Sequence, residues 1–123
     1  MPVGHQGVES MQLFHNPRCS KSRGALELLR ARGLEPRIVT YLDEPPSTGE
    51  LRDLLRKLGV PARALLRTGE AEYAELGLAD ETLGNDALLE AMSAHPRLIE
   101  RPIFVVGDRA VIGRPPERVL DLL

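Results

Sequence analysis

The chain has 123 residues, of which 42% are hydrophobic and 28% are charged, values that are ordinary for one soluble globular domain with its own core. Its formal net charge of −2 gives no sign of a nucleic-acid-binding surface, and no apolar run approaches the roughly 20 residues that span a bilayer. The single cysteine excludes an internal disulfide and a cysteine-rich metal site. We therefore expect a cytoplasmic protein that binds no nucleic acid, membrane or metal.

The N-terminal part of the chain predicts a strand, a helix and a second strand. Residues 1–10 contain no long apolar segment, and we interpret them as a flexible leader before a single domain over residues 11–123. Residues 11–14 form a short apolar run, which favours a first strand over residues 11–15. Residues 20–32 carry apolar side chains at helical spacing and are followed by a glycine, which indicates a helix. Residues 37–41 are rich in β-branched side chains and flanked by prolines, which indicates a second strand.

A helical insertion is predicted over about residues 47–95. Ser47 and Glu50 form a capping-box pattern, and the helix that they open is expected to end at Gly59. Its apolar side is a leucine series at helical spacing: Leu51, Leu54, Leu55 and Leu58. Shorter helices are expected over residues 63–67, 70–76 and 85–94. Asn85 is the expected N-cap of the last of these helices.

The C-terminal part predicts a hairpin and a final helix. Residues 103–106 and 110–112 are apolar runs separated by a Gly-Asp-Arg turn. Pro115 and Pro116 suit the start of a terminal helix, whose apolar residues are Val119, Leu120 and Leu123. The order βαβ, helical insertion, ββα implies one parallel and one antiparallel pairing. We therefore predict an α/β fold of the thioredoxin-like kind, with a mixed sheet covered by helices.

The lone cysteine, Cys19, stands between the first strand and the first helix, in the stretch FHNPRCSKSR. The first turn of a helix presents unpaired N–H groups and the positive end of the helix dipole, which favour a thiolate over a thiol. Four neighbours add possible positive charge: His15, Arg18, Lys21 and Arg23. This setting predicts a reactive nucleophile. A buried structural cysteine is the alternative, and the polar, basic flanks argue against it.

Four short motifs follow one another along the chain. They are a C-x-x-S tetrad at residues 19–22, ALLR at 64–67, ERPI at 100–103 and GRP at 113–115. In this order and at these spacings, they resemble the glutaredoxin-dependent arsenate reductase family. The resemblance extends over about residues 11–123, which is nearly the whole chain.

The resemblance implies a role for each matching residue. Cys19 would attack arsenate and form a thiol–arsenate adduct, with His15 helping to keep the thiol ionised and Ser22 able to hydrogen-bond the thiolate. The oxyanion would be held by three arginines, Arg67, Arg101 and Arg114. Guanidinium groups suit this task because they bond the oxygens of an oxyanion in a forked manner.

The resemblance also implies external reductants and one backbone feature. Glutathione would be the co-substrate that reduces the adduct, and glutaredoxin the partner that recycles the enzyme as arsenite leaves. The absence of a second cysteine agrees with a resolving thiol from outside the chain. The Arg101–Pro102 bond lies where thioredoxin-like folds place a cis proline.

Two other functions remain open at this point. One is a glutathione-dependent thiol transferase on the same scaffold, which would not need three arginines. The other is a Spx-type regulator that binds RNA polymerase, although such regulators usually carry C-x-x-C and this chain has Ser22 in place of the second cysteine. Ser20 and Lys21 stand where the well-studied reductases usually have Gly-Thr, which leaves the identity of the oxyanion open.

Overall fold

The computed structural model describes residues 11–123, and the leader predicted over residues 1–10 lies outside them. The chain divides into two compact units. The first combines the described residues up to Tyr41 with the segment Arg101–Leu123, and the second is Leu42–Glu100. No helix within residues 11–123 is both long and apolar enough to cross a membrane.

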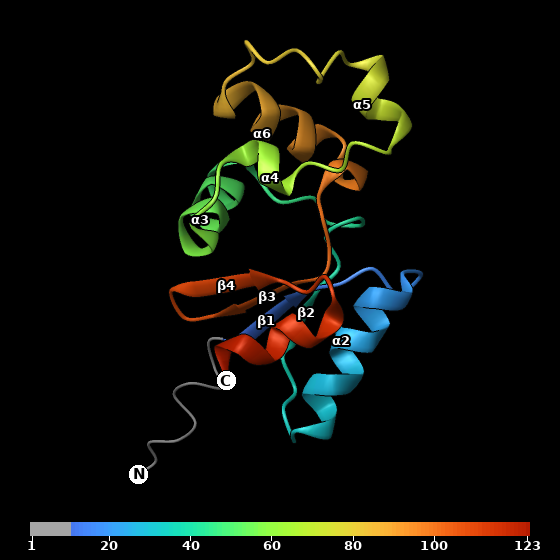
Figure 1. Ribbon diagram of the computed structural model, residues 1–123, viewed down its shortest axis with the longest axis vertical. Coiled ribbons are helices and arrows are strands. Elements are labelled where there is room, and N and C mark those ends of the chain that lie inside the picture. Colours follow the sequence, from blue (N-terminus) through green and yellow to red (C-terminus); the bar gives the residue numbers. More distant parts are fainter. Residues whose placement is uncertain (1–10) are drawn as a thin grey trace. The chain divides into compact units, whose positions relative to one another are not determined.

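The first unit contains a four-stranded mixed sheet in the order β2-β1-β3-β4 (Figure 1). The strands are β1 (Met11–Phe14), β2 (Arg37–Val39), β3 (Ile103–Val106) and β4 (Arg109–Ile112). β1 is parallel to β2 and antiparallel to β3, and β4 is antiparallel to β3. This arrangement confirms the predicted α/β class and mixed sheet. A two-residue turn, Gly107-Asp108, joins β3 to β4, and Gly107 has a positive φ of 58°, which glycine adopts without strain.

One face of the sheet is covered by two helical elements, α2 (Ser20–Ala31) and η2 (Pro116–Leu122), which also pack against each other (Figure 1). The strand register places Leu13, Phe104 and Val111 side by side on that face. The core of the unit contains these three side chains, a further residue of β1 and residues of both helical elements: Met11, Leu13, Ala25, Leu29, Phe104, Val111 and Val119. Burial of this face holds α2 on the sheet and so fixes the position of its first turn.

The terminal helix differs from the prediction. It is a 3₁₀ helix, in which residues three apart are aligned, so Val119 and Leu122 lie on one side. Val119 is fully buried and Leu122 packs against the core, whereas Leu123 is 51% exposed. The expectation that Leu123 belongs to the apolar side was therefore wrong, because Leu123 lies beyond the last residue of the helix, whereas Val119 and Leu120 pack in the core as predicted.

The second unit contains only helical elements (Figure 1). They are α3 (Thr48–Leu58), α4 (Ala62–Leu65), α5 (Ala71–Glu75), α6 (Asn85–Ala94) and η1 (Pro96–Leu98). The capping box of α3 is confirmed, since the Ser47 hydroxyl accepts from the Glu50 N–H and the Glu50 carboxylate accepts from the Ser47 N–H. α3 ends at Gly59, as predicted, with a left-handed φ of 69°. Its buried leucines face α6, which buries Leu88, Leu89 and Met92.

Asn85 does not have the predicted capping role in its own helix. The N-cap of α6 is Gly84, and Asn85 is the first helical residue. Its side-chain oxygen instead accepts a hydrogen bond from the backbone N–H of Ala62, at 3.1 Å. Asn85 therefore satisfies the first free N–H of α4, a neighbouring helix.

Candidate active site

Three of the predicted site segments meet at one end of the sheet. Phe14, the last residue of β1, lies opposite Ile103, the first residue of β3. β4 in turn ends opposite the start of β3. The loop that leaves β1 toward Cys19, the segment with Arg101 that enters β3, and the segment with Arg114 that leaves β4 therefore share this edge. Strand register alone brings these segments together.

Asn16 organises the loop between β1 and α2 through three hydrogen bonds. Its backbone N–H donates to the hydroxyl oxygen of Ser22 at 3.3 Å. Its side-chain oxygen accepts from the Arg18 N–H, and its carbonyl accepts from the Cys19 N–H, each at 3.0 Å. The motifs of the sequence predict no role for Asn16. An asparagine directly before a proline is a turn signal, and that signal could have identified it.

Cys19 is the N-cap residue of α2, with an extended backbone (φ −99°, ψ 124°), and its carbonyl accepts the Arg23 N–H at 3.0 Å. This confirms the predicted position at the start of the helix. The side chain is partly exposed, and the first turn of α2 contains no acidic residue. The Arg23 guanidinium donates to the Pro17 carbonyl at 3.0 Å, so a fixed cation lies against the loop. Nothing in that first turn offsets the positive end of the helix dipole.

Ser22 is fully buried in the first turn of α2. The resemblance implied that it hydrogen-bonds the thiolate, and in the structure its oxygen accepts from Asn16. A hydroxyl has one proton to donate in addition to its lone pairs, so this bond leaves the Ser22 proton available. The observed role of Ser22 is to hold the loop before the cysteine.

His15 is 8% exposed, and its backbone N–H donates to the Val39 carbonyl at 3.1 Å. Burial lowers the pKa of its imidazole from the ordinary value of 6.5, and the nearby charges of Arg30 and Arg23 lower the pKa further. The side chain is therefore mainly neutral at pH 7. The expectation that His15 adds positive charge beside Cys19 was wrong, because the imidazole is desolvated and already faces two arginines.

Arg101 and Arg114 are both partly buried, and the structure brings them together. The Arg114 guanidinium donates to the Arg101 carbonyl oxygen at 3.2 Å. Each arginine precedes a cis peptide bond to proline, Arg101–Pro102 and Arg114–Pro115. The first of these was expected from the resemblance, and the second was not predicted.

Gly113 packs tightly between the segments that carry the two arginines. Its N–H donates to the Pro102 carbonyl at 2.8 Å. A Cβ atom at this position would lie 2.9 Å from Pro102 Cγ and 3.0 Å from Val119 Cγ1, which is closer than ordinary contact. The absence of a side chain at Gly113 therefore allows the end of β4 to lie directly on Pro102.

Arg67 belongs to the second unit, where it directly follows Leu66, which forms an isolated bridge with Ile99. Its backbone N–H donates to the Leu98 carbonyl at 2.7 Å. Its guanidinium contacts two carboxylates, Glu70 at 2.6 Å and Glu100 at 3.7 Å. Of the residues predicted to hold the oxyanion, Arg67 alone lies outside the unit that contains Cys19.

Residues 14–122 match the model of the ArsC family. The chain belongs to the ArsC family. An arsenate reductase from Neisseria meningitidis serogroup A is 50% identical over 117 residues, which cover 94% of this chain and 100% of that protein. A protein of Escherichia coli K12, YfgD, described as uncharacterized, is also 50% identical over 117 residues, covering 94% and 98%.

The fold of this ArsC-family chain also agrees with solved structures. An arsenate reductase from Vibrio cholerae superposes with a TM-score of 0.90 at 49% identity, covering 93% of this chain and 98% of that one. The family resemblance drawn from the four motifs is therefore confirmed, as is the thioredoxin-like fold. Within residues 11–123, no group of three or more His, Cys, Asp or Glu side chains is placed to hold a metal ion.

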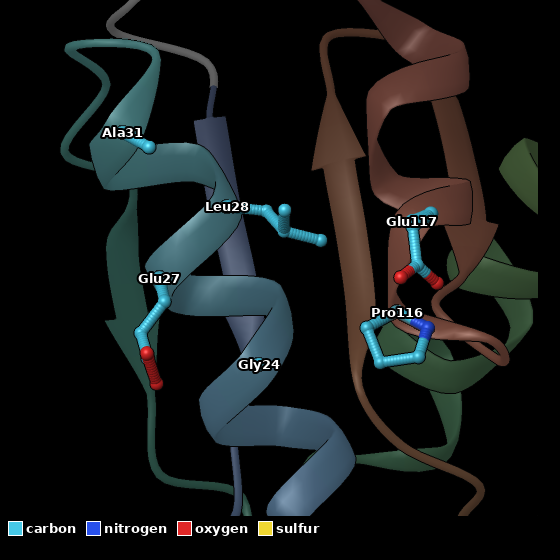
Figure 2. A pocket seen from close by; sticks show the side chains of 6 residues that line it. All are labelled: Gly24, Glu27, Leu28, Ala31, Pro116 and Glu117. Carbon is cyan, nitrogen blue, oxygen red and sulfur yellow. The ribbon is translucent and has the colours of Figure 1, made fainter.

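A groove in the first unit of this ArsC-family chain lies between α2 and η2 (Figure 2). Its volume is about 520 Å³, and Leu28 points into it from α2. The lining residues are Gly24, Glu27, Leu28, Ala31, Pro116 and Glu117. Two carboxylates and no cation line the groove, so it is unsuited to an oxyanion.

Proposed function

We propose that this chain is an arsenate reductase that uses Cys19 as its nucleophile. The observation that carries the proposal is the shared sheet edge, where Cys19 at the start of α2 meets the segments of Arg101 and Arg114. Relatives named arsenate reductase, at about half identity over nearly the whole chain, support the choice of oxyanion. The resemblance adds Arg67 as a third ligand of that anion.

The first step joins the thiol to arsenic. The sulfur of Cys19 attacks As(V), and one arsenate oxygen leaves as water with the thiol proton, giving a thiol–arsenate adduct. A thiolate that approaches an anion is repelled, so fixed cations are needed to bind the arsenate and to screen its charge. Arg101 and Arg114 are suited to this because their planar guanidinium groups bond oxygens in a forked manner. The start of α2 contributes further positive potential.

The second step needs a thiol from outside the chain. Glutathione attacks the sulfur of the adduct, the As–S bonding pair stays on arsenic, and As(V) becomes As(III), which leaves as arsenite. The two electrons come from the two sulfurs, which end as a mixed disulfide between Cys19 and glutathione. Glutaredoxin then returns Cys19 to the thiol by disulfide exchange. The chain has no second cysteine that could replace glutathione in this step.

The test is direct measurement of arsenite produced from arsenate by the purified protein with glutathione and glutaredoxin. We expect arsenite with the wild-type chain and none with Cys19→Ser, because a hydroxyl is too weakly acidic to form the adduct. Thioredoxin should replace glutaredoxin poorly. A chain that yields no arsenite but reduces glutathione mixed disulfides would instead be a thiol transferase, and the proposal would be wrong.

A further inference from the structure

Glu70 forms two ion pairs with arginines in the second unit. One carboxylate oxygen lies 2.6 Å from Nη1 of Arg67, and the other lies 3.1 Å from Nη2 of Arg97. The Glu70 side chain is only 15% exposed and that of Arg67 is 25% exposed, so their pairing is partly shielded from water. Such a pair has a more fixed geometry than an ion pair on an open surface.

The contacts leave a defined part of the Arg67 guanidinium available. Glu70 accepts from Nη1, and the Glu100 carboxylate lies 3.7 Å from Nε. Neither of these two contacts uses Nη2 of Arg67. A guanidinium is planar and carries five N–H groups, so fixing Nη1 sets the direction in which Nη2 points.

We propose that Glu70 is a positioning residue for oxyanion binding, which holds the Arg67 guanidinium in place while its own negative charge weakens the attraction of Arg67 for the anion. This inference rests on the proposed function, in which Arg67 is an oxyanion ligand. The two effects of Glu70 oppose each other: the hydrogen bond favours binding by orientation, and the charge disfavours it by repulsion.

Two substitutions separate these effects. Glu70→Gln keeps an oxygen that accepts from Nη1 and removes the charge, so it should bind oxyanions about two- to fivefold more tightly. Glu70→Ala removes the charge and also releases Arg67, so kcat/KM for arsenate should fall about tenfold through loss of orientation. A purely structural role would move both variants in the same direction. Because Glu70 is expected to have two opposing effects, Glu70→Gln should improve on the wild type in oxyanion binding, and Glu70→Ala should fall below it in kcat/KM.

Oxyanion binding is measured by protection of Cys19: iodoacetamide alkylates the thiol, and the readout is the concentration of inorganic phosphate that halves the alkylation rate. The kcat/KM for arsenate is measured for the same variants. Glu90 is an exposed carboxylate on α6, so Glu90→Gln makes the same change in net charge away from Arg67 and should leave both quantities unchanged. Thermal unfolding checks that each variant is folded. Glu70→Asp, which keeps the charge but shortens the reach to Nη1, replaces Glu70→Ala if that variant does not fold, and should likewise lower kcat/KM.

Arg67→Ala separates failure of this inference from failure of the assigned site. If Arg67→Ala raises the halving concentration of phosphate while Glu70→Ala keeps the wild-type kcat/KM for arsenate, Glu70 has no positioning role. If Glu70→Gln instead matches the wild type or weakens phosphate binding, the charge of Glu70 does not oppose the anion. Either result overturns the inference. If Arg67→Ala leaves phosphate protection unchanged, Arg67 is not an oxyanion ligand, and both this inference and that part of the proposed site are overturned. Arsenite formation by the wild-type chain tests the proposed reaction independently of both results.

Discussion

The backbone N–H of Asn16 donates to the buried hydroxyl oxygen of Ser22, 3.3 Å away and six residues further along the chain. The bond connects the loop after β1 to the first turn of α2, and Cys19 lies between its two ends. Because the hydroxyl is fully buried, water cannot replace it as a partner for the Asn16 N–H. The shape of the loop before Cys19 therefore depends on a side chain that comes after it.

Replacement of Ser22 by alanine should lower the free energy of unfolding by about 1–3 kcal/mol, because it leaves the Asn16 N–H without its acceptor. Urea denaturation measures this loss. Ser20 is exposed in the same turn, and Ser20→Ala should stay within about 0.5 kcal/mol of the wild type. Equal stability of the two variants would show that the Asn16–Ser22 bond contributes nothing to the fold.

Two glycines should respond to alanine with opposite signs. A Cβ at Gly113 would lie 2.9 Å from Pro102 Cγ and 3.0 Å from Val119 Cγ1, so Gly113→Ala should destabilise by about 1–3 kcal/mol through overpacking. A Cβ at Gly24 would lie 3.5 Å from Pro116 Cγ, an ordinary contact, and Gly24→Ala should stabilise α2 by about 0.5–1 kcal/mol. Urea denaturation of both variants gives the comparison, and destabilisation by Gly24→Ala would contradict it.

The burial of His15 predicts a loss of stability in mild acid. Its pKa is lowered in the folded chain, mainly by burial, whereas the unfolded chain keeps the ordinary pKa of 6.5. As pH falls below 6.5, the unfolded state binds the proton first, so the free energy of unfolding decreases until the folded pKa is reached. His15→Gln removes this contribution. Between about pH 7.5 and 5.5 the wild type should lose more stability than His15→Gln, and parallel losses would refute the assignment.

Arg114 should not tolerate lysine. Its guanidinium donates to the Arg101 carbonyl, and a lysine ammonium cannot reproduce the planar fork that the proposed oxyanion site needs in addition. Arg114→Lys should lower kcat/KM for arsenate by about 10²–10³, as removal of a charge-stabilising donor does elsewhere. Arg118→Lys, at a side chain 55% exposed on η2, is the matched control and should keep wild-type activity. A fully active Arg114→Lys enzyme would exclude Arg114 from the oxyanion site.

The fold was predictable where the deciding interactions are local. Ser47 and Glu50 are three residues apart and cap α3 with each other, and Gly59 ends that helix without any distant partner. The alternating order of strands and helices was enough to predict the mixed sheet. Cys19 was placed correctly at the start of α2 because its position depends only on where the preceding strand ends and the helix begins.

The missed features depend on contacts that the sequence pattern does not contain. Asn85 has the residue type of an N-cap, but its partner is Ala62, 23 residues earlier in the chain. The lowered pKa of His15 depends on its burial and on the charge of Arg30, which lies 15 residues later in the chain, in α2. Asn16 has its role through the hydroxyl oxygen of Ser22, six residues later in the chain. In each case a tertiary contact overrides the local pattern.

The Gly107-Asp108 turn is a place where a peptide can be inserted at a distance from the segments of Arg101 and Arg114. It joins the ends of β3 and β4 that are opposite to Arg101 and Arg114, and four residue pairs, or roughly 10 Å of strand, separate it from that edge. Turn tips are where inserted sequence is best tolerated. An affinity tag or a dye-binding peptide grafted there would leave Cys19 as the sole thiol of the chain. Intact-mass measurements on an immobilised sample could then follow the thiol through a complete turnover.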